Sequence, residues 1–207
     1  MTIKDNLESI KKDISDDITI LAATKKRTVK EIQEAIDSGI RIIGENYVQE
    51  AQSKYKELKD KTEIHCIGHL QTNKVKKAVK IFDMIQTVDS LKLAKEINKR
   101  TKKIMPVLIE VNIGEEENKD GCMPSEVKSL AEDITKLPNL QLKGLMTMAP
   151  KGKEEPYFIK IKDIYDRLKE KYNFSILSMG MSDSYREAVK HGCTMIRLGT
   201  ALFGPRN

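Results

Sequence analysis

The chain has 207 residues, 39% of them hydrophobic and 33% charged, and a formal net charge of +6 at pH 7. This composition excludes a disordered chain, and the length suits one sizeable core, so we expect residues 1–207 to form a single domain. The strongest apolar stretch, residues 104–113, contains Glu110 and Asn112 and is too short to span a bilayer. The first residues contain no apolar segment of a secretory signal. We therefore expect a cytoplasmic protein that does not enter membranes.

The cysteines and the basic charge exclude two further classes of protein. Cys66, Cys122 and Cys193 are far apart and form no CxxC pair, so we interpret them as reduced thiols. Lysines occur in every predicted helix, where they alternate with acidic residues, and the chain has no tryptophan. Nucleic-acid binding favours a concentrated basic face and, for single strands, aromatic platforms. We expect a monomer that does not bind nucleic acid.

Short β-branched segments alternate with amphipathic segments of helical length along the chain. A helix over residues 4–14 is predicted first. The predicted strands are residues 18–24, 41–44, 64–68, 84–88, 105–111, 142–148, 176–180 and 195–198. The predicted helices between them are residues 29–38, 48–58, 73–82, 91–102, 124–136, 155–172 and 184–191. Thr28 and Glu31 form a capping box where one helix begins, and Gly39 follows where that helix ends.

Eight strands alternating with helices predict an α/β protein with a parallel sheet. An open doubly wound sheet and a closed (β/α)8 barrel both fit this pattern. The count of eight units favours a TIM-type barrel with an extra N-terminal helix. Because such barrels begin at about 200 residues, little of the chain remains for a second domain.

Functional residues of such barrels follow the C-terminal ends of the strands. Lys25 comes directly after the first strand, and alternation places its side chain on the face of Leu21 and Ala23. Lys25 then points into the barrel mouth, whereas Lys26 points away. A lysine in a confined site can lose its proton and attack an aldehyde. The alternative is an ordinary surface lysine.

The last two strand ends carry groups that could bind phosphate. Ser182 follows the seventh strand at the start of a predicted helix, and Gly199 and Thr200 follow the eighth. Barrels often bind phosphate at these strand ends through backbone amides and a helix N-terminus. The alternative is a turn glycine and a helix-cap serine. Arg197 faces the barrel interior and needs an acceptor, either a ligand group or the acid of a structural ion pair.

The three histidines do not predict a metal site. His65 and His69 lie on one strand and its loop, without acidic or thiol partners at metal-ligand spacing, and His191 is distant. We therefore expect no metal. The sequence also contains no nucleophile elbow, Walker loop or dinucleotide fingerprint.

Five segments at these strand ends carry a resemblance to a known family. They are residues 44–50 (GENYVQE), 65–74 (HCIGHLQTNK), 144–148 (GLMTM), 177–183 (LSMGMSD) and 197–204 (RLGTALFG). In this order, and over nearly the whole chain, they resemble the pyridoxal phosphate homeostasis protein family. The resemblance implies pyridoxal 5'-phosphate (PLP) as cofactor and a fold-type III barrel like the barrel domain of alanine racemase.

The resemblance also implies a role for each site residue. Residues 23–25 correspond to the family's small-Ser-Lys segment, with Thr24 in place of the usual serine, so Lys25 is implied to hold PLP as a Schiff base. The other implied cofactor-binding residues are Asn46 near the ring, Arg197 at the pyridine nitrogen, and Ser182, Gly199 and Thr200 at the phosphate.

The family implies a binding protein that buffers PLP and delivers it to apo PLP-dependent enzymes. The alternative is a single-domain amino-acid racemase, which would need acid–base groups on both faces of the substrate Cα. In two-domain racemases a tyrosine of the second domain supplies one of them, and this chain is too short for that domain. Only Tyr47 and His69 remain as candidates for a second base. We therefore expect a carrier without catalytic residues, not an enzyme.

Overall fold

The computed structural model describes residues 2–205, whose strands form a closed parallel barrel. The strands are β1 (Thr19–Ala23), β2 (Ile42–Glu45), β3 (Glu63–Cys66), β4 (Met84–Val88), β5 (Met105–Val111), β6 (Leu140–Thr147), β7 (Ile176–Ser178) and β8 (Met195–Leu198). They follow one another around the barrel in chain order, and β8 closes it by pairing with β1. The closure confirms the predicted barrel and excludes the open sheet.

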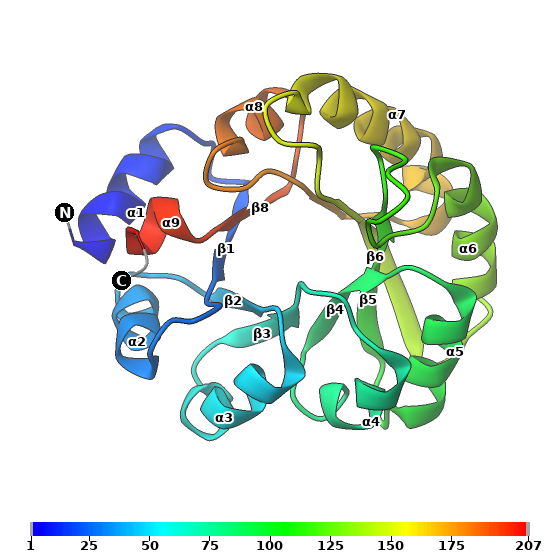
Figure 1. Cartoon of the computed structure of the whole chain (residues 1–207), viewed down its shortest axis with the longest axis horizontal. Coiled ribbons are helices and arrows are strands. Elements are labelled where there is room, and N and C mark those ends of the chain that lie inside the picture. Colours follow the sequence, from blue (N-terminus) through cyan, green and yellow to red (C-terminus); the bar gives the residue numbers. More distant parts are fainter. Residues whose placement is uncertain (1, 206–207) are drawn as a thin grey trace.

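Helices surround the strands as an outer ring (Figure 1). They are α1 (Ile3–Lys12), α2 (Val29–Asp37), α3 (Val48–Leu58), α4 (Val75–Ala78), α5 (Leu91–Arg100), α6 (Val127–Ile134), α7 (Glu154–Tyr172), α8 (Tyr185–Lys190) and α9 (Thr200–Phe203), with 3-10 turns at Thr72–Lys74 and Pro124–Glu126. The extra helix α1 precedes the barrel as predicted, and the capping box at Thr28 is present. Among residues 2–205, no helix is both long and apolar enough to cross a membrane.

Side chains of each strand alternate between an outer and an inner core. On β1, Ala22 packs in the large outer cluster between strands and helices. Leu21 packs instead with Ile67 and Met195 in a small cluster inside the barrel, and Ala23 lies against the same cluster. This arrangement confirms the predicted inward face of the first strand, which Lys25 continues at the mouth.

Several predicted boundaries were wrong near the site. The predicted seventh strand ran to Gly180, but β7 ends at Ser178, and Gly180 has φ +87°, a conformation that favours glycine. The predicted helix over 73–82 is a 3-10 turn followed by the short α4, because the chain turns at Val79 to bury Phe82. Helix α8 begins at Tyr185, so Ser182 lies before this helix and not at its start.

Candidate functional site

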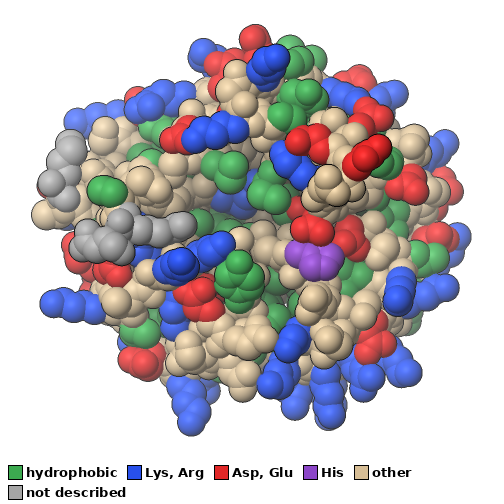
Figure 2. All heavy atoms as spheres, in the orientation of Figure 1, with side chains coloured by type: hydrophobic (Ala, Val, Ile, Leu, Met, Phe, Trp, Pro, Cys, Tyr) green, Lys and Arg blue, Asp and Glu red, His purple; other side chains and the backbone are tan. Residues whose placement is uncertain are grey.

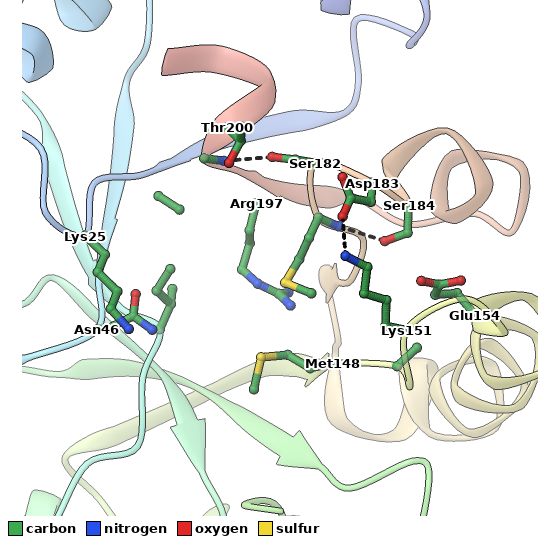
Figure 3. Close-up of a pocket in the computed structure, with 15 residues that line it drawn as sticks. Lys25, Asn46, Met148, Lys151, Glu154, Ser182, Asp183, Ser184, Arg197 and Thr200 are labelled. Carbon is green, nitrogen blue, oxygen red and sulfur yellow. Dashed lines mark hydrogen bonds and ion pairs between the residues drawn. The ribbon is translucent and has the colours of Figure 1, made fainter. Parts of the chain in front are cut away.

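A pocket of about 350 Å³ opens at the C-terminal ends of the strands. Its lining includes all six residues that the sequence predicts for cofactor binding: Lys25, Asn46, Ser182, Arg197, Gly199 and Thr200 (Figure 3). These residues follow β1, β2, β7 and β8 or, for Arg197, lie within β8. Seen from outside, this face is hollowed over the barrel, with hydrophobic, basic and acidic side chains around the hollow (Figure 2). The fold thus gathers residues up to 175 positions apart at one mouth.

Lys25 and Lys26 have different environments although they are adjacent. Lys25 is half-buried and lines the pocket, whereas Lys26 is exposed. The Nζ atom of Lys25 donates a hydrogen bond to the hydroxyl of Tyr47 at 3.3 Å and lies 4.9 Å from the centre of that ring. Asn46 is beside Tyr47 in sequence and also lines the pocket. The amine therefore reaches the mouth next to an amide and a phenol.

Arg197 brings a buried positive charge to the pocket. Only 4% of the residue is exposed, and its guanidinium donates to the Ser178 hydroxyl and to the Thr147 carbonyl, both at 2.9 Å. These partners are neutral, so the structural ion pair considered from the sequence is not what holds this side chain. Burial lowers the pKa of Arg197 to about 10, which still leaves the group charged at neutral pH.

Hydrogen-bonded polar side chains continue from Arg197 down the inside of the barrel. The Ser178 hydroxyl donates to Gln86 Oε1 at 2.8 Å, and Gln86 Nε2 contacts His65 Nδ1 at 2.9 Å. The other ring nitrogen of His65 lies 3.3 Å from the Glu63 carboxylate at the opposite end of the barrel. We call Ser178, Gln86 and His65 the interior chain. It supports Arg197 from below through hydrogen bonds that begin at Ser178.

Ser182 organises the side of the pocket formed by α9. Its Oγ accepts hydrogen bonds from the backbone amides of Gly199 at 3.2 Å and Ala201 at 3.0 Å. Thr200, between them, is exposed and begins α9. The three residues predicted to bind phosphate therefore lie together. The amide of Ala201 was not predicted, because a helix of four residues is too short to show a periodic pattern.

Glu110 is a buried acid that the sequence reasoning did not assign to the site. It is 3% exposed, and its Oε2 atom has no hydrogen-bond partner among residues 2–205. Burial, with smaller contributions from Asp120 and Asp89, raises the pKa of Glu110 to about 7, and Arg197 opposes that shift. The signal was present in the sequence, since Glu110 interrupts the strongest apolar stretch of the chain.

Two histidines have acidic neighbours that the sequence did not predict. His69 Nδ1 lies 3.0 Å from Asp120 and 3.6 Å from Asp89. His191 Nε2 lies 3.0 Å from Glu187 and 3.8 Å from Glu155, and these three residues form one surface cluster. The expectation that His65 and His69 lack acidic partners missed Asp89 and Asp120, which come from segments distant in sequence. Glu187, in contrast, lies only four residues before His191.

The three cysteines are free and buried. Burial raises the pKa of Cys66, Cys122 and Cys193 to about 12 in each case, so all three stay protonated at neutral pH. This result agrees with the interpretation of these residues as reduced thiols.

The fold and the mouth of the barrel define a class of protein. The family model described as "Alanine racemase, N-terminal domain" matches residues 1–207. An alanine racemase of Clostridium difficile 630 superposes with a TM-score of 0.79 at 20% identity, over 99% of this chain and 57% of that chain. At this identity the similarity concerns the fold alone, which is a barrel of the alanine racemase type.

Similarity in sequence identifies the family within this class. Two proteins named pyridoxal phosphate homeostasis protein are similar to this chain: one of Aquifex aeolicus, 43% identical over 90% of the chain and 86% of the relative, and one of Escherichia coli K12, 38% identical over 93% and 87%. PipY of Synechococcus elongatus, solved with PLP bound, is 31% identical with a TM-score of 0.89, over 98% of this chain and 100% of that chain. The chain belongs to the pyridoxal phosphate homeostasis protein family.

Proposed function

We propose that this chain binds PLP, holds it as a Schiff base on Lys25, and buffers and delivers the cofactor to apo PLP-dependent enzymes in the cytoplasm. One observation carries the proposal. A half-buried lysine, a buried arginine and a hydroxyl that gathers two backbone amides line the same pocket. The names of the relatives and the PLP-bound PipY structure support this assignment.

The groups that line the pocket match the three reactive or charged parts of PLP. When bound, the cofactor supplies an aldehyde that combines with amines and a ring that can withdraw electrons. The Lys25 amine suits the aldehyde carbon, and the Arg197 guanidinium suits the ring nitrogen. The Ser182 hydroxyl, with Gly199 and Thr200, suits the phosphate, and a volume of about 350 Å³ lies in the range of small-molecule sites.

Arg197 favours a carrier over an enzyme. An arginine that stays charged at neutral pH can donate a hydrogen bond to a ring nitrogen but does not transfer its proton. A ring held in this way is a weaker electron sink than one protonated with the help of a carboxylate. The groups that hold the guanidinium, Ser178 and the Thr147 carbonyl, carry no charge, so they leave the charge of Arg197 available for a ligand.

The candidates for a second catalytic base do not flank Lys25 from the opposite side. Tyr47 contacts the Lys25 amine directly, but its side chain belongs to a neighbouring hollow and not to the lining of the main pocket. His69 is exposed, pairs with Asp120, and belongs to a neighbouring hollow rather than to the lining of the main pocket. This arrangement supports PLP binding without turnover of amino acids; we further propose that the single barrel domain acts as a monomer.

Incubation of the PLP-loaded protein with L-alanine in deuterated water tests this proposal. The carrier predicts at most slow deuterium exchange at Cα, negligible D-alanine, and reactivation of an added apo PLP-dependent enzyme by the loaded protein. A racemase would turn over at about one per second or faster. Racemisation at that rate, lost in Lys25→Ala and kept in Lys26→Ala, would overturn the carrier function and favour the single-domain racemase.

A further inference from the structure

The two peptide groups that flank the Cα of Lys25 are both held by helix α3. The carbonyl of Thr24, which precedes Lys25, accepts a hydrogen bond from Lys54 Nζ at 3.0 Å. The amide of Lys26, which follows Lys25, donates to Glu50 Oε1 at 2.6 Å. Lys54 Nζ in turn donates to the same Glu50 oxygen at 2.8 Å. One ion pair therefore contacts the backbone immediately before and immediately after the lysine.

The backbone at Lys26 has a conformation that requires such support. Its φ is +60°, in the left-handed region that residues with a side chain rarely adopt. Left-handed residues persist where the surroundings hold them, and they gather at functional sites. Here the Arg27 amide closes the turn by donating to the Thr24 carbonyl at 3.0 Å, and the short hydrogen bond to Glu50 holds the Lys26 amide within it. The turn directs the chain away from the mouth directly after Lys25.

The lysine of the ion pair is buried, and Glu50 is partly buried. The Lys54 side chain is 10% exposed, and its ammonium has three acceptors: the Thr24 carbonyl, Glu50, and Glu45 at 2.8 Å. Glu45 also accepts from the Thr24 hydroxyl at 2.7 Å. An ammonium has three protons, so this geometry satisfies every one of them and fixes the position of Lys54.

We propose that Glu50 and Lys54 are positioning residues for Lys25, and we call this pair the backbone clamp. The inference rests on the proposed role of Lys25 as the residue that holds PLP. By orienting both adjoining peptide planes, the clamp sets φ and ψ of Lys25 and with them the direction of its side chain. It thereby selects Lys25 rather than Lys26 for the pocket, although the two lysines are adjacent and chemically identical.

The test first removes the clamp by substituting Glu50 and then replaces Lys26 by glycine, which adopts the left-handed conformation without support. Glu50→Ala deletes the acceptor of the Lys26 amide, and the expected effect is PLP affinity about tenfold weaker, since hydrogen bonds to charged groups are strong. Glu50→Gln keeps an acceptor oxygen and should lose at most about threefold. Glycine adopts left-handed φ without steric cost, so adding Lys26→Gly to Glu50→Ala should recover at least about threefold of the loss.

A second readout does not depend on PLP. Hydrogen exchange of the Lys26 amide, measured without cofactor, should be at least about tenfold faster in Glu50→Ala than in the native chain. Glu57→Ala, which changes an exposed acid on the same helix, is the matched control and should change neither quantity. If Glu50→Ala does not fold, Glu50→Asp replaces it, because its shorter side chain withdraws the carboxylate from the amide.

Two results would overturn the clamp. One is Glu50→Ala and Glu57→Ala behaving alike in both measurements. The other is a loss of affinity in Glu50→Ala that Lys26→Gly does not recover, which would mean that Glu50 acts through charge or general stability and not through the turn. A native protein that binds no PLP would refute the proposed function, while the amide exchange would still decide whether Glu50 holds the turn.

Discussion

The two sides of the pocket hold their cationic groups in opposite ways. Lys25 is positioned by charged residues on the helix side of the barrel, where Lys54 bridges Glu45 and Glu50. Arg197 is positioned from inside the barrel by two neutral groups, the Ser178 hydroxyl and the Thr147 carbonyl. The comparison shows that the two sides use different kinds of partner. Charges are paired where they fix the backbone, whereas Arg197 is held by uncharged hydrogen-bond partners and interacts electrostatically with the buried Glu110.

The charged side is expected to be the more sensitive to mutation. Lys54→Met leaves the carboxylate of Glu45, which is 1% exposed, without its cation. Removing one partner of a buried ion pair costs about 3–5 kcal/mol, so the free energy of unfolding should fall by that amount. Urea unfolding measures it, with the exposed Lys56→Met on the same helix as control. A loss no larger than that of the control would show that the buried pair does not stabilise the fold.

Inside the barrel, the one buried acid near Arg197 should make stability depend on pH. The pKa of Glu110 rises from 4.5 to about 7 on folding, so the folded state binds the proton more tightly than the unfolded state. The contribution of Glu110 to stability is therefore complete below about pH 4.5, is lost as pH rises to about 7, and is constant above. The full loss is on the order of 3 kcal/mol.

Substitution of this acid isolates the effect. Glu110→Gln should be more stable than the native chain at pH 8 by on the order of 1–3 kcal/mol, relative to the same comparison at pH 4. Urea unfolding of both proteins at the two pH values gives the difference. If the difference in stability between the two proteins does not change with pH, folding does not raise the pKa of Glu110.

Removing a hydrogen-bond partner of Arg197 should reduce stability less than the Lys54 substitution does. Ser178→Ala removes the acceptor of one Arg197 hydrogen bond and the donor to Gln86 Oε1. Buried polar groups left without partners cost about 1–3 kcal/mol, and a less well oriented Arg197 should also weaken PLP binding. Ser175→Ala, an exposed serine just before β7, is the control for the unfolding and binding measurements. Unchanged stability and affinity would show that Thr147 alone positions the guanidinium.

The sequence predicted the barrel and the inward face of its first strand because both follow from local periodicity. Eight short strands with intervening helices restricted the topology, and alternation along β1 correctly distinguished Leu21 from Ala22. The six predicted site residues line one pocket because parallel strands of a barrel end at one mouth. These predictions required no knowledge of which strands pack across the interior.

The hydrogen-bond networks around the site could not be predicted, because they join residues that are distant in the sequence. Ser178, Gln86 and His65 come from three different strands, and their hydrogen bonds depend on register inside the closed barrel. The clamp needs a left-handed residue at Lys26, which no local signal indicated. Partners that are adjacent only after the barrel closes have no spacing pattern in the sequence.

The central claim is that Lys25, and not its neighbour, forms the Schiff base with PLP. Loading the protein with PLP, reducing it with borohydride and mapping the peptides by mass spectrometry tests this claim directly. We expect the visible absorbance band to disappear on reduction and the pyridoxyl group to be found on Lys25. A label mainly on Lys26, or on Lys151 at the rim of the same pocket, would contradict the account.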